Sequence, residues 1–235
     1  PSNVKDIIIY TFYIILSGSV ANLLLDGDKI MLNQYMAIGN IAFYSVATYI
    51  ALVISVPSRA MHQIVYPITA KLMHNNQHDE LNDLYKKTSI NLQIVGGFVM
   101  LCIFVNIEQL YEMIPEEYSG GIFVVFMIGI SKYFDLILGN NNAIIFNTKY
   151  YRAVLFLGVL LVFLTVGLNM IFIPIYGILG SAFATLLSIT LYSLAKLMFV
   201  VKRLHLYPFT PQTFYSLVLT VVLFLLFYFW KFPLY

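Results

Sequence analysis

The chain has 235 residues and a net charge of +2, and 60% of its residues are hydrophobic whereas 10% are charged. Its mean hydropathy is +0.85. Soluble domains contain about 25% charged residues, and a water-soluble fold of this size cannot bury so much apolar surface. The composition therefore predicts an all-α integral membrane protein and argues against a soluble enzyme. Without a basic tract, the chain also lacks the pattern of a nucleic-acid binder.

Apolar runs long enough to cross a bilayer, about 20 residues each, occur seven times. We expect spans at residues 7–25, 40–66, 89–107, 121–139, 153–174, 177–200 and 213–231. Pro57 should kink the second span, and the turn at 174–177 should join the fifth and sixth in a tight hairpin. The polar stretch "KLMHNNQHDELNDLYKKTS" predicts a short amphipathic helix on the membrane surface. Because the chain begins with Pro1 and has no signal peptide, we expect a piece of a longer protein.

The basic residues predict the orientation. If the N-terminus is cytoplasmic, ten of the thirteen basic residues lie in inner segments, Lys29 and Lys231 in outer ones, and Lys132 within a span. The outer loops hold acidic residues instead: Asp26, Asp28, Glu108, Glu112, Glu116 and Glu117. The positive-inside rule then makes the 67–88 and 202–212 loops cytoplasmic and the 108–120 loop external.

Polar residues within spans are costly and therefore informative. In the first span, Ser19, Asn22 and Asp26 share one helix face. They would line a hydrated cavity, or form interhelical hydrogen bonds with Asp26 reaching water. A single cysteine, Cys102, has no partner for a disulfide, and we expect it to pack like its apolar neighbours.

The second span carries Arg59, His62 and Gln63 on one face after Pro57. Arginine grips phosphate oxygens with two parallel hydrogen bonds. The cluster is therefore either a phosphate ligand at the depth of the inner leaflet or a positive-inside anchor without a ligand.

Lys132 and Asp135 stand out most in the fourth predicted span. Lys132 lies near the bilayer midplane, about 16 Å along the helix from Gly121. One interpretation is a self-neutralised pair at i, i+3, and the other is a site for an anionic substrate or a coupling ion. The three asparagines that follow should cap the helix at the cytoplasmic surface: Asn140, Asn141 and Asn142.

The later spans contain fewer polar residues, among them Asn169, Thr185 and Ser188, which alone indicate helix contacts. The four histidines are scattered, and the chain has no HExxH, Walker or GxSxG motif. No catalytic or metal-ligating set is therefore predicted.

Several segments resemble one family of transporters. The stretch "NMIFIPIYGILGSAFATLLS" at 169–188 resembles the "N…liP.yGi.GaA.AT" hairpin of polysaccharide-biosynthesis, O-antigen-type flippases, members of the multidrug/oligosaccharidyl-lipid/polysaccharide exporter superfamily. "LLLDGDKIMLNQYM" is similar to its "D..ml" signature, and "IGNIAFYSVATYI", "VYPITAKL" and "LYEMIPEEYSGG" match further stretches in the same order. The resemblance covers nearly the whole chain.

This resemblance implies a two-lobe transporter of 12 to 14 helices, of which residues 1–235 would form the C-terminal lobe. It implies a multi-pass protein of the bacterial inner membrane. Its activity would be the translocation of an undecaprenyl-diphosphate-linked oligosaccharide for capsule or O-antigen synthesis by alternating access, without ATP hydrolysis. The partners would be the lipid-linked glycan, membrane lipid, the N-terminal lobe and the polysaccharide polymerase machinery.

The resemblance also implies a cation-coupling site. No cofactor is expected, but sodium or proton coupling would use Asp26, Asn169 and Thr185, whereas the second carboxylate of some relatives is replaced by Ile173. The "YSVATY" region lacks the cavity arginine of lipid II flippases, so another glycan lipid is the expected substrate.

The predicted substrate ligands combine these observations. A diphosphate needs a cation, supplied by Lys132 or Arg59, and the sugar needs a hydrated cavity. The candidate ligands are Lys132, Asp135, Arg59, His62, Gln63, Ser19 and Asn22. A drug/cation antiporter of the same superfamily is the first alternative, and a membrane glycan polymerase or glycosyltransferase is an alternative of another class.

Overall fold

The computed structural model describes Val4, Ile8, Thr11, Phe12 and Ile15, and residues 27–148 and 150–229. Residues 27–35 are helical. The elements that follow are α2 (Ile38–Leu52), η1 (Val53–Ser55), α3 (Val56–His74), α4 (His78–Val105), α5 (Ile107–Glu112), η2 (Glu116–Gly121), α6 (Ile122–Ile137), α7 (Asn141–Phe146), α8 (Tyr151–Tyr176), α9 (Ile178–Leu204) and α10 (Pro211–Phe229). The described part of the chain contains no strand.

Five helical stretches within the described residues are long and apolar enough to cross a membrane. They are Gly39–His74, His78–Val105, Arg152–Tyr176, Ile178–Leu204 and Pro211–Tyr228. The predicted first span lies largely outside the described residues, and the predicted span at 121–139 corresponds to α6, which has only 16 residues. The prediction of an all-α membrane protein is confirmed.

The second predicted span is a continuous helical run from α2 through η1 to α3. Residues Val53–Ser55 tighten into a 3-10 turn directly before Pro57, which lies at the start of α3. Proline provides no backbone donor for the preceding turn, and the Ser55 hydroxyl donates to the carbonyl of Leu52 at 2.7 Å. The predicted irregularity at Pro57 therefore takes the form of a local change in helix type.

The polar stretch after the second span does not form a separate surface helix, so that prediction is wrong. Its first residues complete α3, a turn follows, and the rest begin α4. Leu81 and Tyr85 are buried against α7 and α9, in a cluster with Ile144, Ile145 and Val200. The apolar side of the stretch therefore packs against protein, which its periodicity alone could not distinguish from a lipid-facing side.

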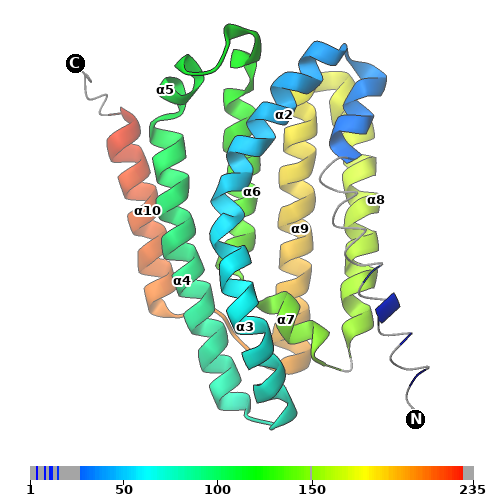
Figure 1. Cartoon of the computed structure of the whole chain (residues 1–235), viewed down its shortest axis with the longest axis vertical. Coiled ribbons are helices and arrows are strands. Elements are labelled where there is room, and N and C mark those ends of the chain that lie inside the picture. The colour runs from blue at the N-terminus through cyan, green and yellow to red at the C-terminus, as the bar shows by residue number, and fades with distance from the viewer. Residues whose placement is uncertain are drawn as a thin grey trace.

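Helix α6 lies at the centre of the helix bundle that the described residues form, which is called the lobe below, and packs against α2, α4 and α9 (Figure 1). Helix α8 covers the far side of α9, and α10 packs on α4 at the opposite edge. Two glycines permit the close approach of α4 and α6: a methyl group at Gly96 would overlap Leu136, and one at Gly129 would overlap Phe104. The centre of the lobe is therefore fixed by tight helix packing.

The connections gather at two ends of the lobe. The α3–α4 turn, α7 and the α9–α10 connection lie at the lower end in Figure 1, whereas residues 27–37, α5 and the α8–α9 turn lie at the upper end. The predicted hairpin is confirmed, since Gly177 alone links α8 to α9, with φ 60° and ψ −132°. This arrangement agrees with the alternation of inner and outer loops, and which end faces the cytoplasm stays a prediction.

Candidate functional site

A buried carboxylate, Asp28, lies near the upper end of the lobe. The Tyr44 hydroxyl of α2 donates to its Oδ2 at 2.9 Å, and the Asn169 amide of α8 donates to its Oδ1 at 2.8 Å. The Thr185 hydroxyl of α9 also donates to Oδ2. Only 4% of Asp28 is exposed. Three neutral donors from three helices therefore replace the water that a buried carboxylate loses.

Two further oxygens near this carboxylate have no partner among the described residues. They are the side-chain carbonyl of Asn169 and the hydroxyl of Ser181, which lies beside Tyr44. Buried polar atoms are nearly always hydrogen-bonded or bound to an ion or water. A carboxylate with neutral oxygens beside it is the donor chemistry that hard cations prefer. We call Asp28, Tyr44, Asn169, Ser181 and Thr185 the outer polar cluster.

The structure brings Asn169 and Thr185 together around Asp28. Asp26, the carboxylate predicted to join them, lies outside the described residues, as do Ser19 and Asn22. A sequence signal for Asp28 was present. In a "D..ml" pattern the aspartate precedes Met-Leu by three residues, and it is Asp28 that stands three residues before Met31.

A second carboxylate, Asp135, lies on α6 in the lower half of the lobe. Lys196 of α9 donates to its Oδ1 at 3.2 Å, and the Ser193 hydroxyl donates to the same atom at 3.0 Å. The Lys196 side chain is 2% exposed and that of Asp135 is 48% exposed. The Lys196 ammonium also lies 4.3 Å from the centre of the Tyr192 ring. The interpretation of Lys132 and Asp135 as a self-neutralised pair is therefore wrong, because Asp135 pairs across helices with Lys196.

Lys132 lies between these two centres. It is half-buried on α6, about 15 Å along the helix from Ile122. It interacts electrostatically with both Asp135 and Asp28. Within the part of the chain that the structure describes, it forms no ion pair or hydrogen bond. Its charge is therefore attracted to two carboxylates and bonded to neither.

The three predicted ligands of the second span have different surroundings. His62 is half-buried, stacks on Tyr66 at a centroid distance of 5.1 Å and interacts electrostatically with Asp135 and Lys196. Arg59 and Gln63 are exposed. Of the three, only His62 is thus brought to the ion pair, and we call Asp135, Lys196, Ser193, Tyr192 and His62 the inner polar cluster.

The asparagines after α6 lie inside the lobe, so their predicted capping role at the surface is wrong. Asn140 is fully buried, donates to the Thr69 hydroxyl at 2.9 Å and accepts from the Thr88 hydroxyl at 3.1 Å. Gly139, with φ 61°, packs against the backbone of Ser89 and makes the reversal possible. This turn connects α6 to α3 and α4.

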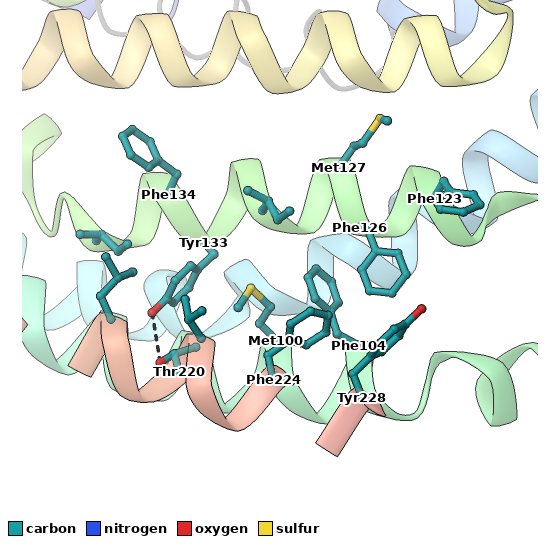
Figure 2. A pocket seen from close by; sticks show the side chains of 14 residues that line it. Met100, Phe104, Phe123, Phe126, Met127, Tyr133, Phe134, Thr220, Phe224 and Tyr228 are labelled. Atoms are coloured by element: carbon teal, nitrogen blue, oxygen red, sulfur yellow. Dashed lines mark hydrogen bonds between the residues drawn. The ribbon is translucent and has the colours of Figure 1, made fainter. Parts of the chain in front are cut away.

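An apolar groove of about 640 Å³ lies between α6 and α10, over α4. Figure 2 shows Phe126 of α6 facing Phe224 and Tyr228 of α10 across it. Phe126 and Phe104 stack edge to face at 4.7 Å. The polar atoms drawn together in the groove are the hydroxyls of Tyr133 and Thr220, 3.5 Å apart. The groove is suited to an aliphatic or polyprenyl chain.

The described residues contain no group of three or more His, Cys, Asp or Glu side chains that could hold a metal ion. The arrangement is instead a series of charged and polar groups that runs across an apolar helical lobe. In order from the upper end, these are the outer polar cluster, Lys132 and the inner polar cluster. Such groups at membrane depth are typical of substrate and ion pathways in transporters.

Comparison with known proteins agrees with a transporter. The chain is 24% identical over 193 residues to the probable flippase AglR of Haloferax volcanii, and the alignment covers 77% of this chain and 39% of that protein. The chain thus spans about two fifths of that relative's length. No family model matches the chain, and no solved structure matches it. The similarity supports a flippase-like multi-pass membrane protein, a transporter in preference to an enzyme.

Proposed function

We propose that the chain is one lobe of a flippase that moves an undecaprenyl-diphosphate-linked oligosaccharide across the bacterial inner membrane by alternating access. The observation that carries the proposal is the similarity to a probable flippase, combined with charged side chains inside an apolar helix bundle. A lipid-linked glycan has an apolar tail, an anionic diphosphate and a hydrated sugar. The lobe offers a groove for the first and, in Lys132, a lysine without a hydrogen bond or ion pair among the described residues for the second.

Lys132 is the proposed ligand of the diphosphate. A charged side chain at the bilayer midplane costs at least about 2.5–3.5 kcal/mol, and a functional ligand compensates that cost when substrate binds. Since Asp135 is already paired with Lys196, Lys132 is available to an incoming anion. Arg59, with an exposed side chain on α3, is the second proposed cation.

The apolar groove between α6 and α10 is the proposed path of the lipid tail. It lies on the α6 face that carries Phe123 and Phe134, whereas Lys132, nine residues after Phe123, lies on the opposite face of α6. A tail in this groove and a diphosphate at Lys132 would therefore use opposite faces of the same helix. The rest of the longer protein would supply the opposite wall of the cavity and a contact with the polymerase machinery.

The outer polar cluster is the proposed site of sodium or proton coupling. It contains Asn169 and Thr185, with Asp28 as the carboxylate that both contact. The unpartnered oxygens of Asn169 and Ser181 support a small cation as ligand.

The proposal is tested by glycan export in cells that depend on the full-length protein. Lys132→Met should lower surface glycan at least about tenfold, because a charge-assisted hydrogen bond contributes about 1.5–3 kcal/mol. The double variant Lys132→Leu/Asp135→Asn should also fail, and Lys202→Met, at an exposed position of α9, should export normally. Variants are compared at equal membrane abundance. Normal export by the double variant would exclude Lys132 as a substrate ligand.

A drug/cation antiporter is the second candidate, and one observation favours it. Asp28 is a buried acid whose hydrogen-bond donors are all neutral in the described structure. Such an acid binds cationic drugs or protons in an exchange cycle. Efflux of a cationic dye by the full-length protein, lost in Asp28→Asn and retained in Lys132→Met, would favour this candidate over the flippase.

A further inference from the structure

Lys132 occupies a position between two negative centres that belong to different parts of the lobe. Asp135 is one helical turn along α6, at i+3, on the side of the lower end. Asp28 belongs to the segment 27–35, at the side of the upper end. Lys132 is an electrostatic neighbour of both carboxylates.

The two carboxylates differ in their other hydrogen-bond and ion-pair partners. Asp135 has its own cation, the buried Lys196 ammonium at 3.2 Å. Asp28 is held by the neutral side chains of Tyr44, Asn169 and Thr185. Electrostatic interactions extend further in an apolar lobe than in water, because the effective dielectric constant is lower. A lysine with a flexible four-carbon stem can follow a change of charge at either end.

We propose that Lys132 couples the outer and inner polar clusters: a cation that enters at Asp28 repels the ammonium of Lys132 toward Asp135, where it competes with Lys196. Coupling of this kind is reciprocal. Loss of the charge at Asp135 then draws Lys132 toward Asp28 and weakens cation binding there. This inference rests on the proposed function for the direction of its effect on substrate, since Lys132 is also the proposed diphosphate ligand. The charge coupling itself exists with or without substrate.

The first test needs neither substrate nor sodium. Thermal unfolding of the full-length protein is measured in nanodiscs in choline chloride for Asp28→Asn, Asp135→Asn and their double variant. Sites without a shared partner give additive effects. Because Lys132 interacts with both carboxylates, the double variant leaves its ammonium without either of them. The midpoint of thermal unfolding of the double variant should therefore lie about 2–4 °C below the value expected from the sum of the two single changes.

The same cycle is repeated with Lys132→Gln and with Lys132→Arg. The additional decrease in the unfolding midpoint of the double variant should vanish in the glutamine background. It should persist in the arginine background, because arginine keeps the charge. The coupling would be overturned if the two single changes had additive effects on the unfolding midpoint with Lys132 present. It would also be overturned if the additional decrease in the double variant were the same with glutamine at position 132. A purely structural role for Lys132 predicts no difference between the two backgrounds.

The second test is a sodium titration of the thermal midpoint, with choline as the control cation. Lys132→Gln should lower the sodium concentration for half-maximal stabilisation about five- to tenfold. Asp135→Asn should raise it with Lys132 present and leave it unchanged with glutamine, and Lys202→Gln should have no effect. A sodium affinity that is the same in the parent and in Lys132→Gln would overturn the coupling. Absence of any sodium effect in the parent would instead refute sodium coupling, and the first test would still decide the role of Lys132.

Discussion

In the described part of the lobe, the charges of Asp28, Lys132, Asp135 and Lys196 are compensated in three ways. Asp28 relies on neutral hydrogen-bond donors, Asp135 and Lys196 rely on each other, and Lys132 relies on long-range attraction. Uncompensated charge is costly in a low-dielectric medium. The charge of Lys132 is the least compensated of the four, and for that reason Lys132 is the strongest candidate for a substrate ligand.

At Asp28 we predict that Asp28→Asn removes ion dependence without loss of protein. The amide keeps the size of the side chain and can still accept from Tyr44 and Thr185, but it no longer attracts a cation. Export should lose its stimulation by sodium or by a proton gradient. The control is Asp83→Asn, at an exposed acid paired with Lys87. A variant that keeps full ion stimulation would remove Asp28 from the coupling site.

At the inner ion pair we predict unequal effects of the two single changes. Asp135→Asn leaves the buried ammonium of Lys196 without its counter-ion, whereas Lys196→Met leaves a carboxylate that is half exposed. The first change should therefore destabilise the lobe more, by about 1–3 kcal/mol in the free energy of unfolding. The double variant should recover most of this loss, because an apolar pair of similar size is often neutral. Equal decreases in the free energy of unfolding in the two single variants would contradict this prediction, which depends on the different exposure of the two side chains.

Some of these residues could be predicted from the sequence and one could not. Asn169 and Thr185 lie in a hairpin with a recognisable pattern, and the spacing to Met31 could have selected Asp28 over Asp26. Lys196 was counted among the cytoplasmic charges. Its partner is 61 residues away on another helix, and local spacing carries no information about such a pair.

Among the helices, the α8–α9 hairpin depends most on small residues. It turns at Gly177 without an intervening loop, and Gly180 lies against the backbone carbonyl of Phe172. Small residues at such contacts allow membrane helices to approach closely. Since Asn169 and Thr185 come from these two helices, the geometry of the outer polar cluster depends on this contact.

We predict that Gly180→Ala destabilises this hairpin by about 1–3 kcal/mol. The added methyl group would overlap the carbonyl of Phe172, which cannot move without distorting α8. Gly167→Ala in α8 is the matched control, because, outside its own stretch of helix, no atom of the described residues lies within 4 Å of the position that its methyl group would take. The control should be neutral or slightly stabilising. Thermal unfolding of both variants distinguishes the contact from a general effect of glycine replacement.

At this scale, apolar runs predicted most helices because twenty apolar residues in lipid form little else. The polar hairpin between α3 and α4 was misread, since Leu81 and Leu84 on one side suit either a membrane surface or a protein surface. The turn at Asn140 was also missed. Its burial depends on Thr69 and Thr88, far away in the sequence.

The whole lobe has two ends, and labelling can determine which faces the cytoplasm. In a Cys102→Ala background, Asp79→Cys lies in an exposed position at the lower end and Met113→Cys at the upper end, where Met113 is 85% exposed. The positive-inside rule predicts that an impermeant thiol reagent labels intact cells at position 113 but not at 79. Permeabilised cells should be labelled at both. Labelling of intact cells at position 79 alone would show that the topology is the reverse of the predicted one.

The length of α6 has a consequence for the molecule in its bilayer. Sixteen residues extend about 24 Å, whereas the hydrocarbon core is about 30 Å thick. The chain does not cover the difference with more apolar helix, because Asn140 and Asn141 turn inward and α7 folds against α3 and α8. Hydrophobic mismatch of this kind is relieved by a thinner membrane or by polar groups that enter it. Under the proposed function, a head group that moves along α6 would therefore cross a shorter dielectric barrier than one that moves through lipid alone.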